Sequence, residues 1–311
     1  MHVYRRSDVL RLIGTVPWLS PFKRLVALVD EEKRLIELVE EHARGICIGG
    51  AAWAKLHYGL REGLVFKSRR EGARVFYLLR EGVYETLLKP SYAPAAITEV
   101  QIENDLVKLC FVGLAGAGIA LLGRAAAEGV YDAEVVEEQG YWKAKLSIPK
   151  CVKLMVGVDD TDTGSEGATW ALVNECGYML ESSSETYYVD NAIVQLYPEN
   201  PFKTQNCASS AIALGVRPKH VEKIQERIIG FLRGNTRSTR TGIAFYVGLE
   251  APKLVQKFLK RARKELVDVE LAREVAMKTG IKLCSFQEER GVIGALAALA
   301  GLGKPEVVAR V

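Results

Sequence analysis

Three aspartates within four positions, Asp159, Asp160 and Asp162, form the chemically most distinctive group of the 311-residue sequence. They follow the hydrophobic run Val156-Gly157-Val158, which predicts a strand that ends at the first carboxylate. Carboxylates this dense repel one another, and Mg²⁺ typically binds one or two carboxylates together with substrate phosphates. Because ligands of α/β proteins bind beyond the carboxyl ends of strands, the pattern predicts a magnesium and phosphate site. A turn held by aspartate side chains is the alternative.

The same loop carries Thr161 and Thr163, and a helix is expected to begin near Ala168. Backbone N–H groups in the first turn of such a helix can hold a phosphate. Thr169 is either the hydroxyl that caps this helix or a reactive hydroxyl, and the cap is favoured when the residue is considered alone.

Two further segments carry groups that suit phosphate binding. Residues 200–210 place Lys203 before Thr204 and Asn206, and a helix of small residues is expected to follow. The lysine can act as a point charge on phosphate, although a solvated surface lysine is the simpler interpretation. Arg290, Gly291 and Gly294 open an apolar helix of small residues. Glycines at this spacing permit close approach of a nucleotide or of a neighbouring helix.

Three weaker patterns are better explained by structure than by ligand binding. The glycine-rich stretch 113–118 resembles a phosphate loop, but core packing is favoured. The polar loop 234–242 offers Arg237 and Arg240 to the phosphates of a nucleotide or RNA, and solvation is favoured. Basic residues between 253 and 264 can contact RNA or an acidic protein, and a salt-bridged helix face is favoured.

These groups must be positioned by an α/β or α+β fold of mixed β-sheets with flanking helices, arranged in two domains. We expect helices over residues 21–44, 115–128, 168–180, 220–233, 252–279 and 293–300. We expect strands over residues 46–48, 74–79, 96–102, 106–112, 132–138, 141–148, 153–158, 187–197, 243–248 and 281–286. The predicted organisation is a helical or mixed N-terminal region at 1–95, a βα unit at 96–150 that packs on the catalytic part, and a domain at 151–311 that carries the aspartate loop.

Composition excludes several classes of protein. With 42 basic and 38 acidic residues, the net charge is +4, and it is divided evenly between the two halves. The six cysteines form no CxxC pair, which disfavours a zinc ribbon and favours a reducing cytoplasm. No apolar run reaches 18 residues, so no membrane span is expected, and the N-terminus lacks the apolar core of a signal peptide.

Taken together, the three segments resemble the kinase-type catalytic domain of the archaeal agmatidine-forming tRNA-isoleucine cytidine synthetase. That family has the motifs G-I-D-D-T-D-S, P-W-K-T and R-G-L-I-G-A-x-A-A, and the resemblance covers residues 153–302. It implies ATP and Mg²⁺ at Asp159, Asp160 and Asp162, and a catalytic or phosphorylated Thr169. It also implies nucleotide contacts from a wider set of residues: Thr161, Thr163, Lys203, Thr204, Asn206, Arg290, Gly291 and Gly294. In that family the cytidine carbonyl is phosphorylated, and agmatine then displaces the phosphate.

Two departures separate the chain from the tRNA enzyme. About 150 residues precede its aspartate motif, and it lacks the paired cysteines of that enzyme's zinc ribbon. Its layout is more similar to methanogenesis marker protein 11, a family of methanogenic archaea that carries the motif internally.

The two resemblances together imply a cytoplasmic ATP- and Mg²⁺-dependent enzyme, phosphotransferase-like or ligase-like, that activates an acceptor oxygen in a methanogenesis-linked modification or maturation pathway. Nucleotide is the expected ligand, and a protein of methyl-coenzyme M reductase maturation is a possible partner. The alternatives are an enzyme that modifies a tRNA or RNA base, with RNA not favoured, and an ATP-binding regulatory or scaffold subunit without turnover. A homodimer is left open.

Overall fold

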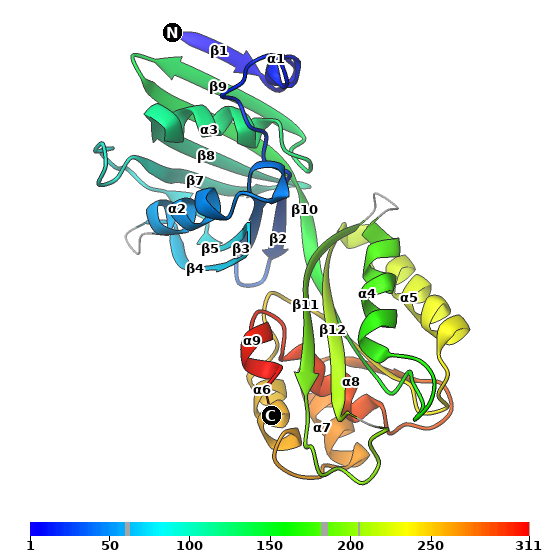
Figure 1. The fold of residues 1–311 in the computed structure, drawn as a ribbon. Coiled ribbons are helices and arrows are strands. Elements are labelled where there is room, and N and C mark those ends of the chain that lie inside the picture. The colour runs from blue at the N-terminus through cyan, green and yellow to red at the C-terminus, as the bar shows by residue number, and fades with distance from the viewer. Residues whose placement is uncertain (60–62, 182–185, 205, 311) are drawn as a thin grey trace. The chain divides into compact units, whose positions relative to one another are not determined.

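The computed structural model describes residues 1–59, 63–181, 186–204 and 206–310. The fold is mixed α/β and divides into two compact units, Met1–Cys151 and Val152–Val311 (Figure 1). One long strand, β10 (Tyr141–Asp159), runs through the boundary between them. Residues 96–150 lie in the first unit together with residues 1–95.

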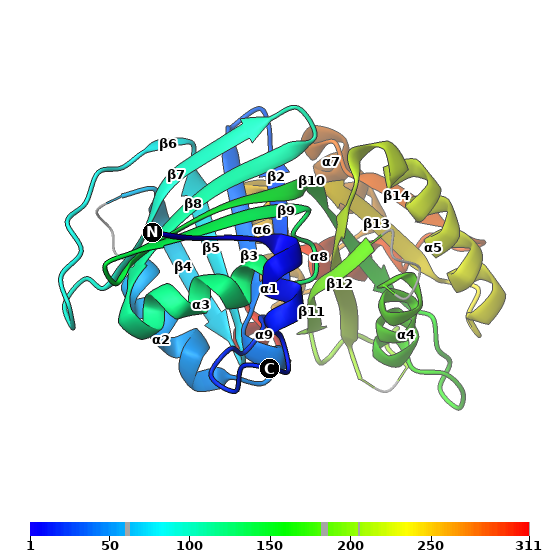
Figure 2. The same ribbon diagram turned by 90° about the horizontal axis from the view of Figure 1, so that it is seen from above.

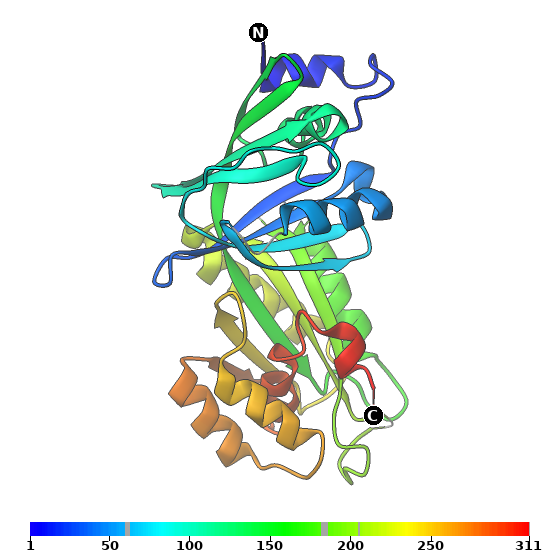
Figure 3. The same ribbon diagram turned by 90° about the vertical axis from the view of Figure 1, so that its left-hand side faces the viewer.

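The first unit is built on strands in the order β4-β5-β3-β2-β10-β8-β7-β6, with β9 paired to β1 and to β10. Helices α2 and α3 lie side by side against these strands (Figure 3). Its elements are β1 (His2–Arg5), α1 (Arg6–Leu12), β2 (Arg24–Asp30), β3 (Leu35–Glu41), a 3-10 turn (Ala43–Gly45), α2 (Ile48–Tyr58), β4 (Val65–Glu71), β5 (Arg74–Arg80), β6 (Gly82–Val83), β7 (Ala95–Glu103), β8 (Leu106–Leu114), α3 (Ala115–Ala125) and β9 (Asp132–Glu138).

Two predictions for the N-terminal region are wrong. The helix expected over residues 21–44 is the antiparallel hairpin of β2 and β3, which turns at Arg34 with a φ of 51°. Both strands are buried along almost their whole length, Glu37, Glu40 and Glu41 of β3 included, so the apolar–polar alternation that marks a half-buried strand is absent from the sequence. Residues 46–48, where a strand was expected, instead lead from the 3-10 turn into α2, and the Cys47 side chain caps α2 by accepting a hydrogen bond from Gly50 N. The other strands and the helix predicted in this unit are confirmed as β5, β7, β8, β9 and α3, whereas the two strands predicted over residues 141–148 and 153–158 are one continuous strand, β10.

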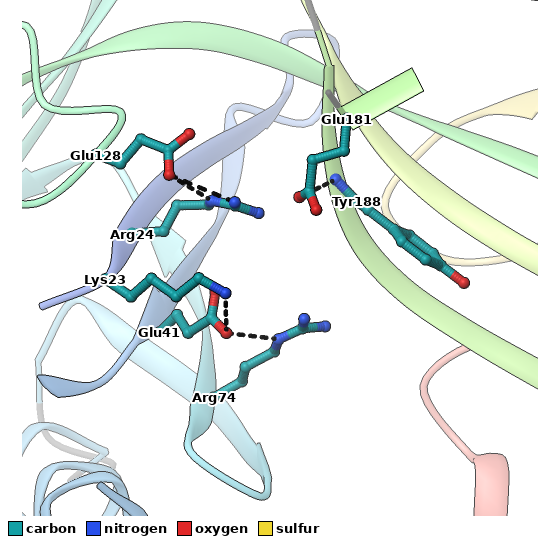
Figure 4. Close-up of polar contacts among 7 residues, drawn as sticks. All are labelled: Lys23, Arg24, Glu41, Arg74, Glu128, Glu181 and Tyr188. Atoms are coloured by element: carbon teal, nitrogen blue, oxygen red, sulfur yellow. Dashed lines mark hydrogen bonds and ion pairs between the residues drawn. The ribbon is translucent and has the colours of Figure 1, made fainter. Parts of the chain in front are cut away.

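Ion pairs connect the first-unit strands at their ends (Figure 4). Glu41 Oε1 lies 3.4 Å from Lys23 Nζ and 3.7 Å from Arg74 Nε, which links β3 to β5. Arg24 on β2 contacts Glu128 Oε2 at 3.4 Å. These contacts hold segments that are up to 104 positions apart in the sequence.

Among its described residues, the second unit has an antiparallel sheet of five strands in the order β11-β12-β10-β13-β14. Its elements after β10 are α4 (Thr169–Glu181), β11 (Thr186–Gln195), β12 (Ala208–Val216), a 3-10 turn (Pro218–His220), α5 (Val221–Asn235), β13 (Gly242–Val247), α6 (Lys253–Ala262), α7 (Val269–Thr279), β14 (Lys282–Ser285), α8 (Val292–Leu299) and α9 (Pro305–Val308). Within this unit, the Glu181 side chain at the end of α4 accepts a hydrogen bond from Tyr188 N on β11 (Figure 4). None of the described helices in either unit has the length and hydropathy needed to cross a bilayer.

Helices cover both faces of this sheet. Side chains along β10 point alternately to the two faces, so the core is divided into two clusters. Leu154, Val156 and Val158 pack with α4 and α5 in one apolar cluster, whereas Met155 faces the cluster built with α6, α7 and α8. The view from above shows α4 and α5 on one side of the strands (Figure 2). A period of two is what a strand covered on both faces requires.

Two predictions for the second unit are also wrong. The helix expected over residues 252–279 is two helices, α6 and α7, and Asp268 caps the second by accepting a hydrogen bond from Leu271 N at 2.8 Å. The small-residue helix expected after residue 206 is the strand β12, which is buried between β11 and β10. Its small side chains allow α8 to pack closely on it. The remaining elements agree with the prediction to within a few residues.

Candidate functional site

One pocket in the second unit collects residues from all three motif segments. Asp159 ends β10, and Asp160 and Asp162 lie in the loop that follows. The loop before β12 contributes Lys203, Thr204 and Asn206, and the start of α8 contributes Arg290 and Gly294, which all line the same pocket. Segments up to 135 positions apart in the sequence therefore meet at one end of the strand β10.

The two glycines of the third segment lie directly against the aspartate loop. A Cβ on Gly294 would lie 1.7 Å from Asp159 Oδ2, so the carboxylate occupies the space that a side chain would need. A Cβ on Gly291 would lie 2.2 Å from Arg240 O and 3.1 Å from Asp159 O. The glycine spacing therefore serves a close approach of α8 to the aspartates, and it brings the N-terminus of α8 to this pocket.

The aspartates repel one another within this pocket. Removal from water raises the pKa of Asp159 well above its ordinary value, and the negative charges of Asp160 and Asp162 raise it further. The pKa of Asp160 is also raised by burial, although the Arg240 and Arg290 guanidinium groups oppose this effect. Asp160 is held at a φ of 54°, a left-handed conformation that side chains rarely adopt. The loop thus concentrates negative charge that the two arginines do not neutralise.

A divalent cation fits this donor set if a ligand supplies the remaining oxygens. Within the described residues, no three His, Cys, Asp or Glu side chains converge as a metal site. Mg²⁺ commonly uses one or two carboxylates and completes its shell with phosphate oxygens and water. Burial raises the pKa of Asp159 and Asp160, and a bound cation would favour the ionised form of both carboxyl groups.

The three threonines near the loop occupy different environments. Thr169 is the first residue of α4 and is buried, and its Oγ1 accepts hydrogen bonds from Thr161 N at 3.1 Å and from Thr161 Oγ1 at 3.0 Å. Its own N–H donates to Asp162 Oδ2 at 3.4 Å. Thr163 is exposed and closes a turn with Glu166. Thr161 and Thr169 thus tie the aspartate loop to the first turn of α4.

Residues 201–203 are exposed, and they pack against Arg290 of the third segment. Lys203 Nζ donates to Pro198 O, and the Arg290 guanidinium lies 3.3 Å from the ring centroid of Phe202. Arg240 donates to Phe202 O at 3.2 Å. Phe202 thereby contacts both arginines, of which Arg290 lines the pocket.

A second pocket adjoins the first. Asp162, Thr204 and Asn206 line both pockets, so the two meet at these side chains. The second pocket also includes Thr169 and Trp170, and the Trp170 side chain is 56% exposed.

The loop 234–242, for which solvation was the favoured interpretation, contacts the aspartate loop. Arg237 N donates to Thr161 O at 2.9 Å, and buried Thr241 donates to Asp160 O at 2.9 Å. Together with Arg240, these contacts brace the aspartate loop and place a guanidinium beside it. The two arginines and the hydroxyls of this loop were visible in the sequence, but nothing in their spacing indicated which loop they contact.

Comparison with known proteins identifies relatives of the second unit. Residues 155–229 match the TiaS TCKD domain. Over 162 residues the chain is 32% identical to the tRNA 2-agmatinylcytidine synthetase TiaS of Methanosarcina acetivorans, and the alignment covers 49% of the chain but 37% of that enzyme. The crystal structure of TiaS in complex with its tRNA and ATP aligns with 48% of the chain and 36% of its own, at 24% identity and a TM-score of 0.43. The chain therefore spans little more than a third of the TiaS length.

A second similarity extends over nearly the whole chain. It is 38% identical over 281 residues to "Uncharacterized protein MJ0921" of Methanocaldococcus jannaschii, and the alignment covers 89% of this chain and 93% of that protein. The chain therefore belongs to the same family as MJ0921, and its second unit contains a segment that matches the TiaS TCKD domain.

Proposed function

We propose that the second unit is an ATP- and Mg²⁺-binding, kinase-like domain that activates an oxygen atom of an RNA base by phosphoryl transfer. The observation that carries this proposal is the convergence of the aspartates with Lys203 and Arg290 on one pocket. Carboxylates for a metal and cations for phosphates are the two groups that phosphoryl transfer needs, since its catalysis is mainly positioning and charge stabilisation.

The aspartates are the proposed metal ligands. Asp159, Asp160 and Asp162 are close enough for the charge of one to raise the pKa of another, and Mg²⁺ would bind a subset of them together with ATP phosphates. When bound, the metal would neutralise phosphate charge and orient the transferred group. The same binding would remove the repulsion that raises the pKa of Asp159 and Asp160.

The remaining residues have proposed roles around the phosphates. Lys203 and Arg290 stabilise negative charge as the phosphoryl group leaves. Arg240, which is held by its hydrogen bond to Phe202 O, adds a third positive charge. The other proposed nucleotide contacts are Thr161, Thr163, Thr204, Asn206, Gly291 and Gly294. Thr161 acts through the loop backbone, and the two glycines allow close approach of α8.

Thr169 stays the proposed phosphate contact or phosphorylation site. Its Oγ1 accepts two hydrogen bonds from Thr161 and keeps its own proton for donation. Phosphorylation would need this buried hydroxyl to exchange those partners. Its position in the second pocket makes a contact with the ligand of that pocket the simpler role.

Two adjoining pockets suit a reaction between two substrates. A phosphoryl donor and its acceptor must meet in line, and the pockets meet at Asp162, Thr204 and Asn206. ATP phosphates fit the pocket that contains the arginine and lysine, and the acceptor fits the pocket with exposed Trp170, on whose ring a base can stack.

An RNA base is the acceptor best supported by the similarity to TiaS, whose name describes a tRNA cytidine product. This reverses the preference of the sequence analysis for a methanogenesis-linked acceptor, such as a protein of methyl-coenzyme M reductase maturation. In the proposed reaction, the γ-phosphoryl group passes from ATP to the acceptor oxygen with release of ADP, and an amine then displaces the phosphate.

The test measures ATP consumption by the full chain with Mg²⁺ in the presence of bulk tRNA, of ribosomal RNA or of an RNA-free protein extract. Stimulation by tRNA, with a modified cytidine found by mass spectrometry of the digested RNA, supports the proposal. Stimulation by the protein extract alone would move the acceptor to a protein. Tight ATP binding without consumption under all three conditions would instead indicate a regulatory subunit. The variant Asp160→Asn tests the role of the aspartate loop in the same assay. Glu175→Gln, on the exposed face of α4, is its matched control.

A further inference from the structure

The second unit contains another pocket, here named the basic pocket, that the proposed function does not use. It is formed by α6, by the C-terminal end of α8 and by α9, and the labels of α6 and α9 lie next to each other in Figure 1. None of its described lining residues is acidic, and four are basic: Lys260, Arg263, Lys264 and Lys304. The floor between these cations is apolar and consists of Leu259, Ala300, Val307 and Val308.

The positive charges of the basic pocket are not neutralised within the part of the chain that the structure describes. Lys260, Lys264 and Lys304 are exposed, and no ion pair of these three lysines is found there. Arg263 Nη2 donates to Arg310 O at 2.6 Å, and this backbone contact leaves the charge of the guanidinium in place. The apolar floor offers no counter-charge, so the four cations stay available to an anionic ligand.

A neighbouring arginine of α6 differs from the cations of the pocket. Arg261 forms an ion pair with Glu265, so the salt-bridged helix face expected between residues 253 and 264 is confirmed there, but Arg261 does not line the basic pocket. The C-terminal ends of α6 and α8 also favour cations through the helix dipole. Each such end carries about −0.5 of an elementary charge, so the two ends offset roughly one of the four positive charges. The pocket therefore keeps a positive potential that attracts a polyanion.

The basic pocket lies close to the two pockets of the proposed reaction. Gln195 at the end of β11 lines the pocket proposed for the acceptor, and Tyr197, two residues later, lines the pocket proposed for ATP. Tyr197 N donates to Ala262 O at 3.0 Å, and the next residue, Arg263, lines the basic pocket. Since consecutive Cα atoms are about 3.8 Å apart, this path is on the order of 15 Å long. A nucleic acid strand, which rises about 3.4 Å per nucleotide in a duplex, spans it with a few nucleotides.

We infer that the basic pocket binds backbone phosphates of the RNA strand whose base enters the acceptor pocket. The inference rests on the proposed function for the choice of RNA as the acceptor. Lys260, Lys264 and Lys304 contact the phosphates through their ammonium groups, and Arg263 contributes the N–H groups that Arg310 does not use. Because phosphate contacts position a strand without reading its sequence, the basic pocket orients the acceptor and does not select the base.

The test measures binding of fluorescently labelled bulk tRNA to the full chain by anisotropy, without ATP. Lys260→Gln combined with Lys304→Gln removes two exposed charges, and thermal unfolding checks that the fold is retained. We expect at least tenfold weaker binding at roughly 0.1 M salt. The slope of log affinity against log salt should fall by about 1.5, because each phosphate contact contributes about 0.7–0.9 to it. An unchanged affinity and slope would overturn the inference.

Two lysines outside the basic pocket provide the matched control. Lys55 on α2 and Lys219 in the 3-10 turn before α5 are exposed and do not line the pocket. Lys55→Gln combined with Lys219→Gln removes the same net charge, and we expect it to weaken tRNA binding less than threefold. Equal losses in the two double variants would show that only net charge matters, and they would overturn the assignment of the phosphates to this pocket.

An acidic protein segment is the other polyanion that suits four cations. Unlabelled poly-L-glutamate and unlabelled tRNA, at equal concentrations of negative charge, compete with the labelled tRNA in the same assay. We expect the polypeptide to compete at least tenfold more weakly than tRNA. Competition by poly-L-glutamate as strong as that by tRNA would assign the pocket to an acidic protein and would overturn the inference.

The binding assay and the ATP assay separate this inference from the proposed function. Binding of tRNA that depends on Lys260 and Lys304, without ATP consumption, would support the basic pocket and contradict the proposed phosphoryl transfer. Stimulation of ATP consumption by tRNA, with equal tRNA binding by the wild type and the Lys260/Lys304 variant, would support the proposed function and overturn the basic pocket. Absence of tRNA binding by the wild type would also overturn the inference.

Discussion

The two units contain charged groups in opposite arrangements. In the first unit, burial alone would raise the pKa of Glu40, but the Arg124 charge overcomes this and lowers it to about 2. In the second unit, burial and neighbouring carboxylates raise the pKa of Asp159 and Asp160. The first arrangement is complete within the protein, whereas the second lacks positive charge. A charge cluster that is complete within the chain stabilises the fold, and one that is incomplete indicates a ligand.

Removal of one partner from the complete pair should have the largest effect on stability. Arg124→Met leaves the Glu40 carboxylate buried without a counter-charge, which costs about 3–5 kcal/mol. Denaturant unfolding, monitored by hydrogen exchange of residues 36–42, measures this loss of stability in the first unit. Lys108→Met, which breaks a surface pair with Glu103, should cost less than about 1 kcal/mol. Similar losses in the two variants would contradict the contrast.

A methyl group beside the incomplete cluster should have the next largest effect. Gly294→Ala forces the Asp159 carboxylate to move, because the new Cβ would lie 1.7 Å from its Oδ2. Overpacking of this kind costs about 1–3 kcal/mol, and we expect ATP affinity to fall at least tenfold. The matched control is Gly230→Ala in α5, where a Cβ meets nothing within 4 Å and where alanine should stabilise the helix by about 0.5–1 kcal/mol. An ATP affinity of Gly294→Ala equal to that of the wild type would show that Asp159 has no role in nucleotide binding.

The two clusters should respond to pH with opposite signs. Stability from Glu40 is fully present above its ordinary pKa of 4.5 and is lost as the pH falls toward about 2. Asp159 and Asp160 have raised pKa values in the folded state, so their contribution is present below the ordinary value of 3.8 and is lost as the pH rises.

Added Mg²⁺ makes this difference measurable. It should stabilise the second unit by about 1 kcal/mol more at pH 7.5 than at pH 5, because it binds the ionised carboxylates. Thermal unfolding at both pH values, with and without Mg²⁺, provides the measurement. Asp160→Asn should reduce this pH-dependent gain, and a gain of equal size in that variant would argue against metal binding at the loop.

Lys203→Gln should have the smallest effect. The side chain is exposed and donates to the Pro198 carbonyl, so we expect no measurable loss of stability. ATP affinity should fall a few-fold, by roughly 1 kcal/mol or less, because a solvated charge interacts weakly with phosphate. Titration of ATP into the variant and the wild type measures the change, and an unchanged affinity would remove Lys203 from the site.

Local sequence patterns identify the aspartate loop better than they identify the buried pair of Glu40 and Arg124. The density of carboxylates at Asp159–Asp162 and the glycines at 291 and 294 are visible within short segments. The pair of Glu40 and Arg124 joins residues 84 positions apart, and neither has a distinctive neighbourhood in the sequence. Residue types in a short segment indicate chemistry, but only the fold shows which charges meet.

The same limit explains the errors in secondary structure. The apolar residues of β2 and β3 fit a helical spacing, and only their pairing in the sheet makes them strands. At α6 and α7 the helical periodicity of the sequence continues through residues 263–267, and only the cap at Asp268 marks the start of a new helix. Strands β7, β8 and β9 agree with the prediction because turns at Asn104 and Gly140, both with a positive φ, mark their ends.

The most direct test of the account is calorimetric titration of ATP into the full chain with and without Mg²⁺, for the wild type and for Asp160→Asn. We predict that ATP binds the wild type in a Mg²⁺-dependent manner, and that the variant retains its fold but loses this dependence. ATP binding of equal affinity without Mg²⁺, or in both proteins with Mg²⁺, would contradict the claim that the aspartate loop binds the metal–nucleotide complex.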